Sequence, residues 1–279
     1  MSIQEKAKLA AQWIQEASVI MIAAGAGMGV DSGLPDFRGA QGLWTKFPEL
    51  KELNWGFQDI ASPKAFREHP YLAWNFYAKR LDSYRRTTPH AGFEILLRWV
   101  ALTTQGHRVF TSNIDGQFQK AGFASHQVLE VHGSIHRLQC LRPCRDDIWD
   151  ADVYQPKFCV EGNLLCPPPT CPHCGGLARP HVLMFDDWGY IDGPTMQEVS
   201  AFNVWGFKHK NELLVIELGA GKTISTVRRY GERFAHRFIR INPNEWGVPS
   251  GKSRMGIQGG ALSVLQQIDA ELMALRDQR

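Results

Sequence analysis

A glycine-rich stretch directly after a short apolar segment is the feature that most constrains the fold of this chain. Residues 18–24 (SVIMIAA) form a continuous apolar run, which is typical of a fully buried parallel strand. Residues 25–33 contain four glycines, which would let backbone N–H groups approach a pyrophosphate, and a helix beginning after them would add a favourable dipole. Val30 occupies the position of the third glycine in the G-x-G-x-x-G spacing, so the glycines alone fit a dinucleotide site and an ordinary strand-to-helix turn equally well.

Three residues that follow the glycines favour the dinucleotide site. Asp36, Phe37 and Arg38 place an acid, an aromatic ring and a guanidinium in a row. We interpret the segment that carries them as a mobile loop. Glycines and loop together predict a nucleotide-binding function at this end of the first strand.

Helical and extended segments alternate along much of the chain. Residues 3–17 have apolar side chains at helical spacing, and Pro89 stands where a helix often begins. This alternation predicts an α/β fold with a Rossmann-like, doubly wound parallel sheet. The expected strands are residues 18–24, 107–111, 127–131, 181–185, 213–218 and 237–241, and the expected helices are residues 3–17, 63–87, a segment from Pro89 and residues 260–276.

All six cysteines of the chain lie in one proline-rich segment with little periodicity. Cys140 and Cys144 form one pair and Cys171 and Cys174 form a second, the pattern of a four-thiolate structural zinc site. Four sulfurs close the coordination shell and leave no position for water, so a catalytic zinc is not expected.

Two cysteines remain outside this pattern. Cys159 and Cys166 are spare, and Cys166 or His173 could replace one of the four proposed ligands. The segment interrupts the alternating pattern, so we interpret it as a small zinc-binding module inserted into a larger domain. The expected domains are a Rossmann-like domain of residues 1–133 and 181–279 and a zinc module of residues 134–180.

Charge and composition exclude several functional classes. The 31 basic residues nearly balance the 28 acidic ones, which does not suggest a nucleic-acid-binding protein. No run approaches the roughly 18 apolar residues of a membrane span. Clustered cysteines favour metal over disulfides in a reducing compartment, so we expect a cytoplasmic protein that binds neither nucleic acid nor membrane. The oligomeric state is left open.

Taken together, the motifs resemble those of the sirtuin family over roughly residues 10–275. Several ordered matches at long range are far more specific than any single one. The matching segments are residues 25–38, with a Gly-Ala-Gly turn leading to Gly-Leu-Pro-Asp-Phe-Arg; residues 111–115, Thr-Ser-Asn-Ile-Asp; His132-Gly133 followed by Cys140; and residues 171–185, from Cys-Pro-His-Cys-Gly-Gly to Arg-Pro-His-Val-Leu-Met-Phe.

The resemblance implies an NAD-dependent protein-lysine deacylase, acting on acetyl-lysine or on lysines with acidic acyl groups such as succinyl and malonyl. NAD and an acyl-lysine protein or peptide would meet between the two domains, and the products would be nicotinamide and O-acyl-ADP-ribose. His132 would be the general base, because a neutral imidazole can accept a proton from a ribose hydroxyl near pH 7. Asn113 would orient the ribose or a water, and Asp115 would accept from the nicotinamide carboxamide.

The resemblance also implies the binding residues. Phe37 would cover the reactive ribose face, and Arg38 would neutralise phosphate charge. The implied NAD contacts are Gly25, Ala26, Gly27, Asp36, Phe37, Arg38, Ser112, Asn113, Ile114, Asp115, Gly219, Ala220, Gly221, Asn242, Gly260 and Ala261, and the implied substrate contacts are Tyr77, Arg80, Val182 and Phe185.

The chain departs from the family pattern at several of these positions. Gly29 stands where the family usually has serine, and Ser112 stands where it usually has glutamine, so cofactor affinity or geometry is expected to differ. Asp186 replaces a glycine in the segment that pairs with substrate in the family. The family's Gly-Thr-Ser motif becomes GAGKT at residues 219–223.

Tyr77 and Arg80 have two interpretations. A phenol and a guanidinium one helical turn apart could clamp the carboxylate of a succinyl or malonyl group, as in relatives that remove acidic acyl groups. Alternatively, they belong to an amphipathic helix with an aromatic core face and a solvated arginine.

Two other functions remain alongside the deacylase. One is an NAD glycohydrolase or a protein ADP-ribosyltransferase, because residues expected to contact the cofactor are unusual. The other is an NAD-sensing protein with weak catalysis on the same fold. The presence of His132 argues against a pure binding protein.

Overall fold

The computed structural model describes residues 1–35, 43–45 and 47–278. Its strands are β1 (Ile20–Ala24), β2 (His107–Thr111), β3 (Val128–Glu130), β4 (Gly133–Cys140), β5 (Ile148–Asp150), β6 (Ala178–Val182), β7 (Leu214–Leu218), β8 (Arg237–Asn242) and β9 (Arg254–Gln258). Its helices are α1 (Ile3–Glu16), α3 (Pro48–Glu52), α4 (Phe57–Ile60), α5 (Pro63–Glu68), α6 (Pro70–Arg86), α7 (Ala91–Val100), α8 (Gln117–Lys120), α9 (Gly193–His209), α10 (Thr226–Phe234) and α11 (Ala261–Asp277).

A six-stranded parallel sheet forms the larger part of the molecule, in the order β3-β2-β1-β7-β8-β9. The chain winds outward from β1 to β3, returns to the centre, and winds outward again from β7 to β9. The order therefore reverses between β1 and β7, and in such sheets ligands bind beyond the carboxyl ends of the strands at this point. The expected doubly wound α/β fold is confirmed.

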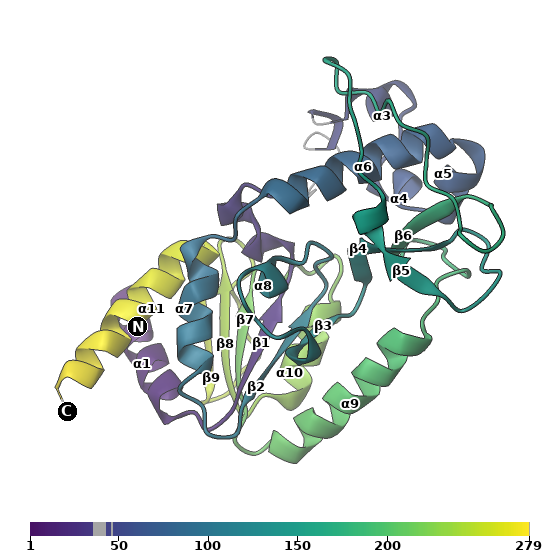
Figure 1. The fold of residues 1–279 in the computed structure, drawn as a ribbon. Coiled ribbons are helices and arrows are strands. Elements are labelled where there is room, and N and C mark those ends of the chain that lie inside the picture. Colours follow the sequence, from purple (N-terminus) through teal and green to yellow (C-terminus); the bar gives the residue numbers. More distant parts are fainter. Residues whose placement is uncertain (36–42, 46, 279) are drawn as a thin grey trace.

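Helices cover both faces of this sheet, as Figure 1 shows. Helices α1, α7 and α11 pack on one face, against apolar side chains of β1 and β7. Helices α9 and α10 pack on the other face. All five residues of β1 and of β7 are buried, which explains why their sequences are almost wholly apolar. The charged residue of β7, Glu217, pairs with Arg240 of β8.

A second, antiparallel sheet has the order β5-β4-β6, and helices α3 to α6 pack against it. Trp74, Phe76 and Tyr77 of α6 lie in one apolar cluster with Ile135 of β4 and Val182 of β6, which we call the aromatic cluster. The helices α3 to α6 therefore share a core with the small sheet rather than with the parallel one. The domain boundaries expected from the sequence stay a prediction.

The sequence pattern located several elements correctly and misplaced others. The expected helix at residues 63–87 is two helices, because Pro70 begins α6 and His69 before it has a non-helical backbone conformation, with φ −135° and ψ 61°. The strand expected at residues 181–185 is β6, Ala178–Val182, and it pairs in the small antiparallel sheet instead of the parallel one.

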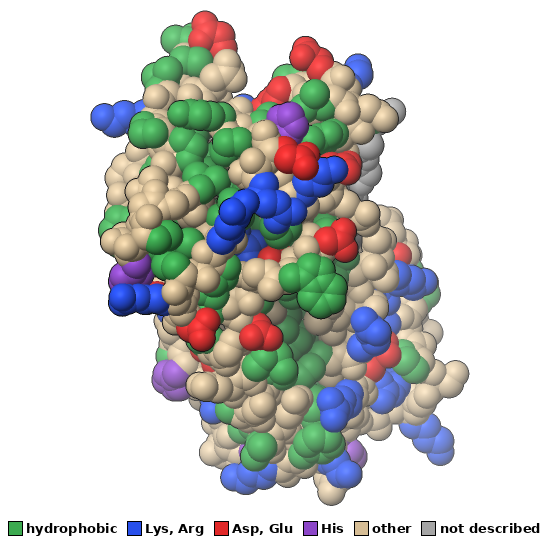
Figure 2. All heavy atoms as spheres, turned by 90° about the vertical axis from the view of Figure 1, so that its right-hand side faces the viewer, with side chains coloured by type: hydrophobic (Ala, Val, Ile, Leu, Met, Phe, Trp, Pro, Cys, Tyr) green, Lys and Arg blue, Asp and Glu red, His purple; other side chains and the backbone are tan. Residues whose placement is uncertain are grey.

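Three elements at the C-terminal side were not expected from the sequence. Helix α9 exposes large apolar residues, Met196, Val204 and Phe207, so its apolar pattern is irregular. Helix α10 was not recognised in the sequence. Strand β9 was not recognised either, and it contains Gly256, where a Cβ atom would lie 2.0 Å from the Trp246 carbonyl oxygen. On the face formed by the small sheet and α9, charged side chains of both signs are interspersed with apolar ones (Figure 2).

Within the described ranges, none of the helices combines the length and the apolar character needed to cross a lipid bilayer.

Candidate functional site

The two glycine stretches of the sequence lie against each other at the reversal point of the sheet. The N–H of Gly27 donates to the Gly219 carbonyl at 3.1 Å, and the N–H of Gly25 donates to the Leu218 carbonyl at 2.9 Å. A Cβ atom on Gly27 would lie 2.7 Å from the Gly219 Cα atom, and Gly219 itself has a φ of +60°. Only glycines allow this approach, which leaves backbone groups of both stretches at the edge where a ligand would bind.

The first stretch does not lead into an α-helix as the sequence suggested. Residues 26–28 and 30–32 form two short 3₁₀ turns, and Gly33 ends the second one in the left-handed region. This edge of the sheet therefore carries short turns rather than the N-terminus of a long helix. Asp36, Phe37 and Arg38 lie outside the described residues.

Asn113 and Ser112 follow β2 and reach the first glycine stretch. The Asn113 side-chain amide donates to the Gly25 carbonyl at 3.1 Å, and the Ser112 N–H donates to the Ala24 carbonyl at 3.2 Å. Ile114 turns away from this edge and packs in the aromatic cluster.

Asp115 continues this turn and faces the glycine-rich stretch. Its Oδ2 atom lies 3.7 Å from the position of a Cβ atom on Gly29, and its Oδ1 atom accepts from the Gln117 N–H at 3.0 Å. Burial raises the pKa of Asp115 to about 6, although the positive charge of Arg80 partly opposes this. A serine at position 29 would place its hydroxyl beside this carboxyl group, and the glycine removes that partner.

We expect Asp115→Asn to stabilise the folded protein at pH 8. A carboxyl group whose pKa is raised by folding costs stability as the pH rises from its unfolded value to about 6, and an uncharged asparagine avoids that cost. The expected gain at pH 8 is about 1–3 kcal/mol, and it should shrink to about 0.5 kcal/mol near pH 4, where the wild-type group is protonated in the folded state and about half protonated in the unfolded chain. Urea unfolding at both pH values checks this, with the exposed Asp277→Asn as control. An equal difference at pH 4 and pH 8 would contradict the assignment.

His132 lies between β3 and β4, beside the same turn. Its carbonyl accepts from the Leu183 N–H at 2.9 Å, and its ring hydrogen-bonds the backbone of Ser112. Burial lowers the pKa of His132 below its usual value, so the imidazole is neutral at pH 7 and can accept a proton.

Gly133 holds His132 in place. Its φ is +75°, and a Cβ atom there would lie 2.2 Å from the His181 carbonyl oxygen. No other residue fits between β4 and β6 at this point, so the backbone itself requires the glycine of the His-Gly pair.

The remaining expected cofactor residues lie along the same edge. The Asn242 amide donates to the Ala220 carbonyl at 3.1 Å, and the Nε atom of Arg228 donates to the same oxygen at 3.0 Å. Arg228 was missed in the sequence because nothing in its local pattern separates it from the surface arginines beside it.

The start of α11 completes this edge. Gly260 is its N-terminal capping residue and Ala261 its first residue, and the Leu262 N–H donates to Asp31 Oδ2 at 2.8 Å. Asp31 lies within the second 3₁₀ turn, so α11 is fixed against the glycine-rich stretch.

Tyr77 and Arg80 are both buried, so the interpretation with a solvated arginine is wrong. The Arg80 guanidinium donates from Nε and Nη2 to the Tyr84 hydroxyl at 3.1 and 2.9 Å, and it also lies over the rings of Tyr77 and Phe57. Burial raises the pKa of Tyr77 to about 12, which keeps the phenol protonated. Phe57 in turn meets Phe185, with ring centroids 6.1 Å apart.

A buried ion pair shapes the segment after β6. Arg179 and Asp187 form two hydrogen bonds, at 2.6 and 2.9 Å, with no exposed side-chain surface. Asp187 also accepts from the backbone of Met184 and Gly189. Asp186 has a φ of +53°, a conformation that favours glycine, which explains the glycine of the family pattern at this position.

Four cysteines converge as expected for a structural metal. The Sγ atoms of Cys140, Cys144, Cys171 and Cys174 all lie within 4.8 Å of one another, with Cys140–Cys174 and Cys144–Cys171 each at 3.7 Å. A tetrahedral zinc with Zn–S bonds of about 2.3 Å places its sulfurs about 3.8 Å apart, so the four thiols fit zinc.

The other candidate metal ligands of the sequence make different contacts. Cys159 accepts from the Asn163 N–H, Cys166 contacts the Tyr154 hydroxyl, and His173 pairs with Asp147.

Comparison with known proteins agrees with this arrangement. The family model described as "Sir2 family" matches residues 25–204. An NAD-dependent protein deacylase of Aeropyrum pernix is 32% identical over 69% of this chain and 66% of its own length. The mitochondrial NAD-dependent protein deacylase sirtuin-5 of Canis lupus familiaris is 34% identical over 66% of this chain and 60% of its own length. The chain thus spans just under two thirds of these two relatives.

A longer match and a solved structure extend the comparison. NAD-dependent protein deacylase 2 of Pyrobaculum aerophilum is 33% identical over 89% of this chain and 88% of its own length. A crystal structure of a Sir2 homologue with NAD has the same fold, with a TM-score of 0.70 and 21% identity over 95% of this chain and 93% of the other.

Proposed function

The chain belongs to the Sir2 family, and from this premise we propose that it is an NAD-dependent protein-lysine deacylase. The observation that carries the proposal is the convergence of four segments at one edge of the sheet. The neutral imidazole of His132, the amide of Asn113 and the two glycine stretches come from distant parts of the sequence and meet where the strand order reverses.

The residues at this edge suit cleavage of a glycosidic bond. Bound NAD would supply the ribose carbon that the acyl oxygen attacks and the nicotinamide that leaves. His132 would take a proton from a ribose hydroxyl, a transfer that requires the uncharged ring found here. The N–H groups of Gly25, Gly27 and Gly219 are used within the fold, so those of the residues between and after them, Ala26, Ala220 and Gly221, would hold the phosphates. Asp115, when ionised, would accept from the carboxamide.

The substrate would be an acylated lysine of a protein or peptide. Val182 and Phe185 lie at the junction between the small sheet and the Rossmann-like part, and Val182 belongs to the aromatic cluster. Their apolar side chains would suit the methylene stem of an acyl-lysine. The zinc would have a structural role only, and the thiol-rich module supports a cytoplasmic location.

The direct test combines the wild-type protein, NAD and peptides carrying acetyl- or succinyl-lysine, with products identified by mass spectrometry. Formation of nicotinamide and O-acyl-ADP-ribose only when an acyl peptide is present is the expected result. Nicotinamide release without a peptide would favour the glycohydrolase, and NAD binding without turnover would favour a sensor.

Arg80 provides a prediction about acyl preference. If its guanidinium receives the carboxylate of an acidic acyl group, Arg80→Met should lower kcat/KM for succinyl-lysine by about 100-fold, because a charge-assisted hydrogen bond is lost in a buried site. Acetyl-lysine removal should change much less and serves as the internal control for folding. Equal losses with both acyl groups would assign Arg80 to the aromatic core instead.

A further inference from the structure

His90, the residue before α7, is buried against the first glycine stretch. Its ring Nε2 atom is 2.9 Å from the Met28 carbonyl oxygen, and its backbone N–H donates to the Ser32 hydroxyl at 3.0 Å. Met28 belongs to the first 3₁₀ turn of this stretch and Ser32 to the second. One residue from a distant part of the sequence thus binds both turns.

The two ring nitrogens of His90 have different partners. The Gly92 N–H donates to Nδ1 at 3.0 Å, so Nδ1 caps the N-terminus of α7 as an acceptor and carries no hydrogen. The hydrogen of the neutral ring is therefore on Nε2, which donates it to the Met28 carbonyl. The imidazole joins the first turn of α7 to the first glycine stretch.

Gly92 makes room for this ring within α7. A Cβ atom on Gly92 would lie 2.5 Å from the His90 Cε1 atom and 2.7 Å from its Nδ1 atom. Glycine is unfavourable inside a helix, because it loses more backbone freedom on folding than any other residue. Here it lets the imidazole lie against the first turn, so the contact with Met28 depends on two positions of the sequence.

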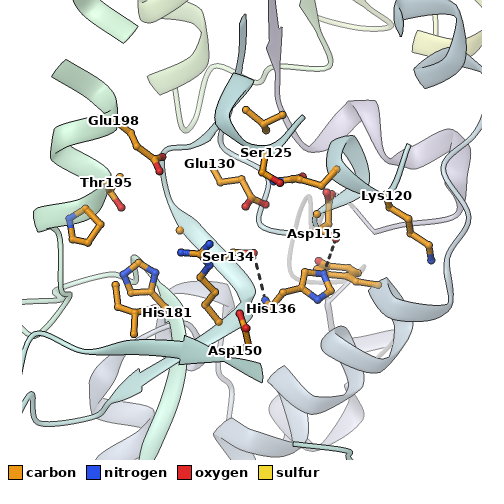
Figure 3. Close-up of a pocket in the computed structure, with 18 of the residues that line it drawn as sticks. Asp115, Lys120, Ser125, Glu130, Ser134, His136, Asp150, His181, Thr195 and Glu198 are labelled. Carbon is orange, nitrogen blue, oxygen red and sulfur yellow. Dashed lines mark hydrogen bonds between the residues drawn. The ribbon is translucent and has the colours of Figure 1, made fainter. Parts of the chain in front are cut away.

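A second turn at this edge of the sheet is held in the same way. The close-up of the cavity in Figure 3 shows the His136 ring directed at the turn after β2, with its Nε2 atom 3.0 Å from the Asp115 carbonyl oxygen. A Cβ atom on Gly116 would lie 2.9 Å from this ring, so a glycine again admits the imidazole. Two turns that would face the cofactor thus each have a carbonyl oxygen bound by a histidine from another segment.

We propose that His90 is a positioning residue for NAD, whose Nε2–H group holds the 3₁₀ turns in the conformation that receives the phosphates. Met28 lies two residues after Ala26, whose N–H group would bind a phosphate. Asp31 fixes the second turn separately, by accepting from the Leu262 N–H at 2.8 Å. Loss of the Met28 contact should therefore loosen the turns without unfolding them. The effect on affinity rests on the proposed use of this stretch by NAD, whereas the effect on the turns does not.

Two substitutions separate the two nitrogens of the ring. Asparagine places an oxygen at the position of Nδ1 but does not reach Met28, so His90→Asn keeps the helix cap and loses the contact with the turn. Glutamine carries its amide group at the distance of Nε2, so His90→Gln keeps a donor for the Met28 carbonyl and loses the cap. A histidine that only caps α7 is replaced better by asparagine, and a histidine that positions the turn is replaced better by glutamine.

Titration calorimetry with NAD measures this difference. The Kd for NAD should rise about three- to tenfold in His90→Asn, the range expected for one lost hydrogen bond, and less than about twofold in His90→Gln. The KM for NAD should follow the Kd while kcat changes little, because the contact acts on binding. Thermal unfolding should show the opposite order, with His90→Gln the less stable variant. The control is His236→Asn, an exposed histidine at the amino end of β8, which should match wild type in both measurements.

Hydrogen exchange tests the hold on the turns without NAD. Backbone exchange across residues 26–33 should be about three- to tenfold faster in His90→Asn and unchanged in His90→Gln. An unchanged Kd in His90→Asn, or an equal rise in both variants, would overturn the proposal. Should His90→Asn not fold, Ser32→Ala removes the other hydrogen bond between the turns and His90, and an unchanged Kd there overturns the proposal equally. If wild type binds NAD but acts on no acyl peptide, the deacylase is refuted and the calorimetric comparison still decides the role of His90.

Discussion

Replacing His132 with alanine should reduce deacylation by about 100- to 10,000-fold, the range typical of a lost general base. The ring is neutral and makes one hydrogen bond, to the backbone of Ser112, so its removal should disturb the fold little. NAD binding, measured by calorimetry, should persist because the glycine stretches that would hold the phosphates are unaffected. The loss should therefore appear in kcat more than in KM.

A matched control shows whether the loss of activity is specific to His132 or follows the removal of any histidine. His126 is an exposed imidazole after α8, and His126→Ala should retain wild-type turnover. Undiminished deacylation in His132→Ala would remove His132 from the mechanism, and with it the main support for the proposed reaction.

Loss of a zinc ligand should have the largest effect on stability. Cys171 is buried within the four-sulfur cluster, and Cys171→Ser should remove most of the bound zinc and the cooperative unfolding of the small sheet. Metal binding by such sites is worth on the order of 10 kcal/mol of folding free energy. Because β4 carries Cys140 at one end and follows His132 directly at the other, activity should be lost together with the metal.

Zinc content by elemental analysis and thermal unfolding by circular dichroism check this expectation. Cys159→Ser is the control, since its sulfur lies in the same small module but outside the cluster. One zinc per chain in wild type and Cys159→Ser, and nearly none in Cys171→Ser, is the expected pattern. A fully folded, metal-free Cys171→Ser variant would show that the module does not need the ion.

Local patterns in the sequence predicted five of the six strands of the parallel sheet, missing β9, and two cysteine pairs for the metal, with Cys166 or His173 left as alternatives for one ligand. Mostly apolar runs identify β1, β7 and β8 because both faces of these strands are covered, and the buried Glu217 of β7 and Arg240 of β8 pair with each other. The paired spacing of the cysteines identifies the zinc ligands because two tight turns present the sulfurs.

Other features depend on contacts between distant segments, and only the tertiary structure decided them. The sequence of α6 alone could not show whether Arg80 is exposed. Its hydrogen-bond partner Tyr84 lies on the same helix, but other elements of the aromatic cluster bury both residues. The Asp115–Gly116 turn likewise meets the His136 ring, which a different element brings to it. A sequence period records which face of an element is apolar, but burial and pKa are set by everything that packs against a group.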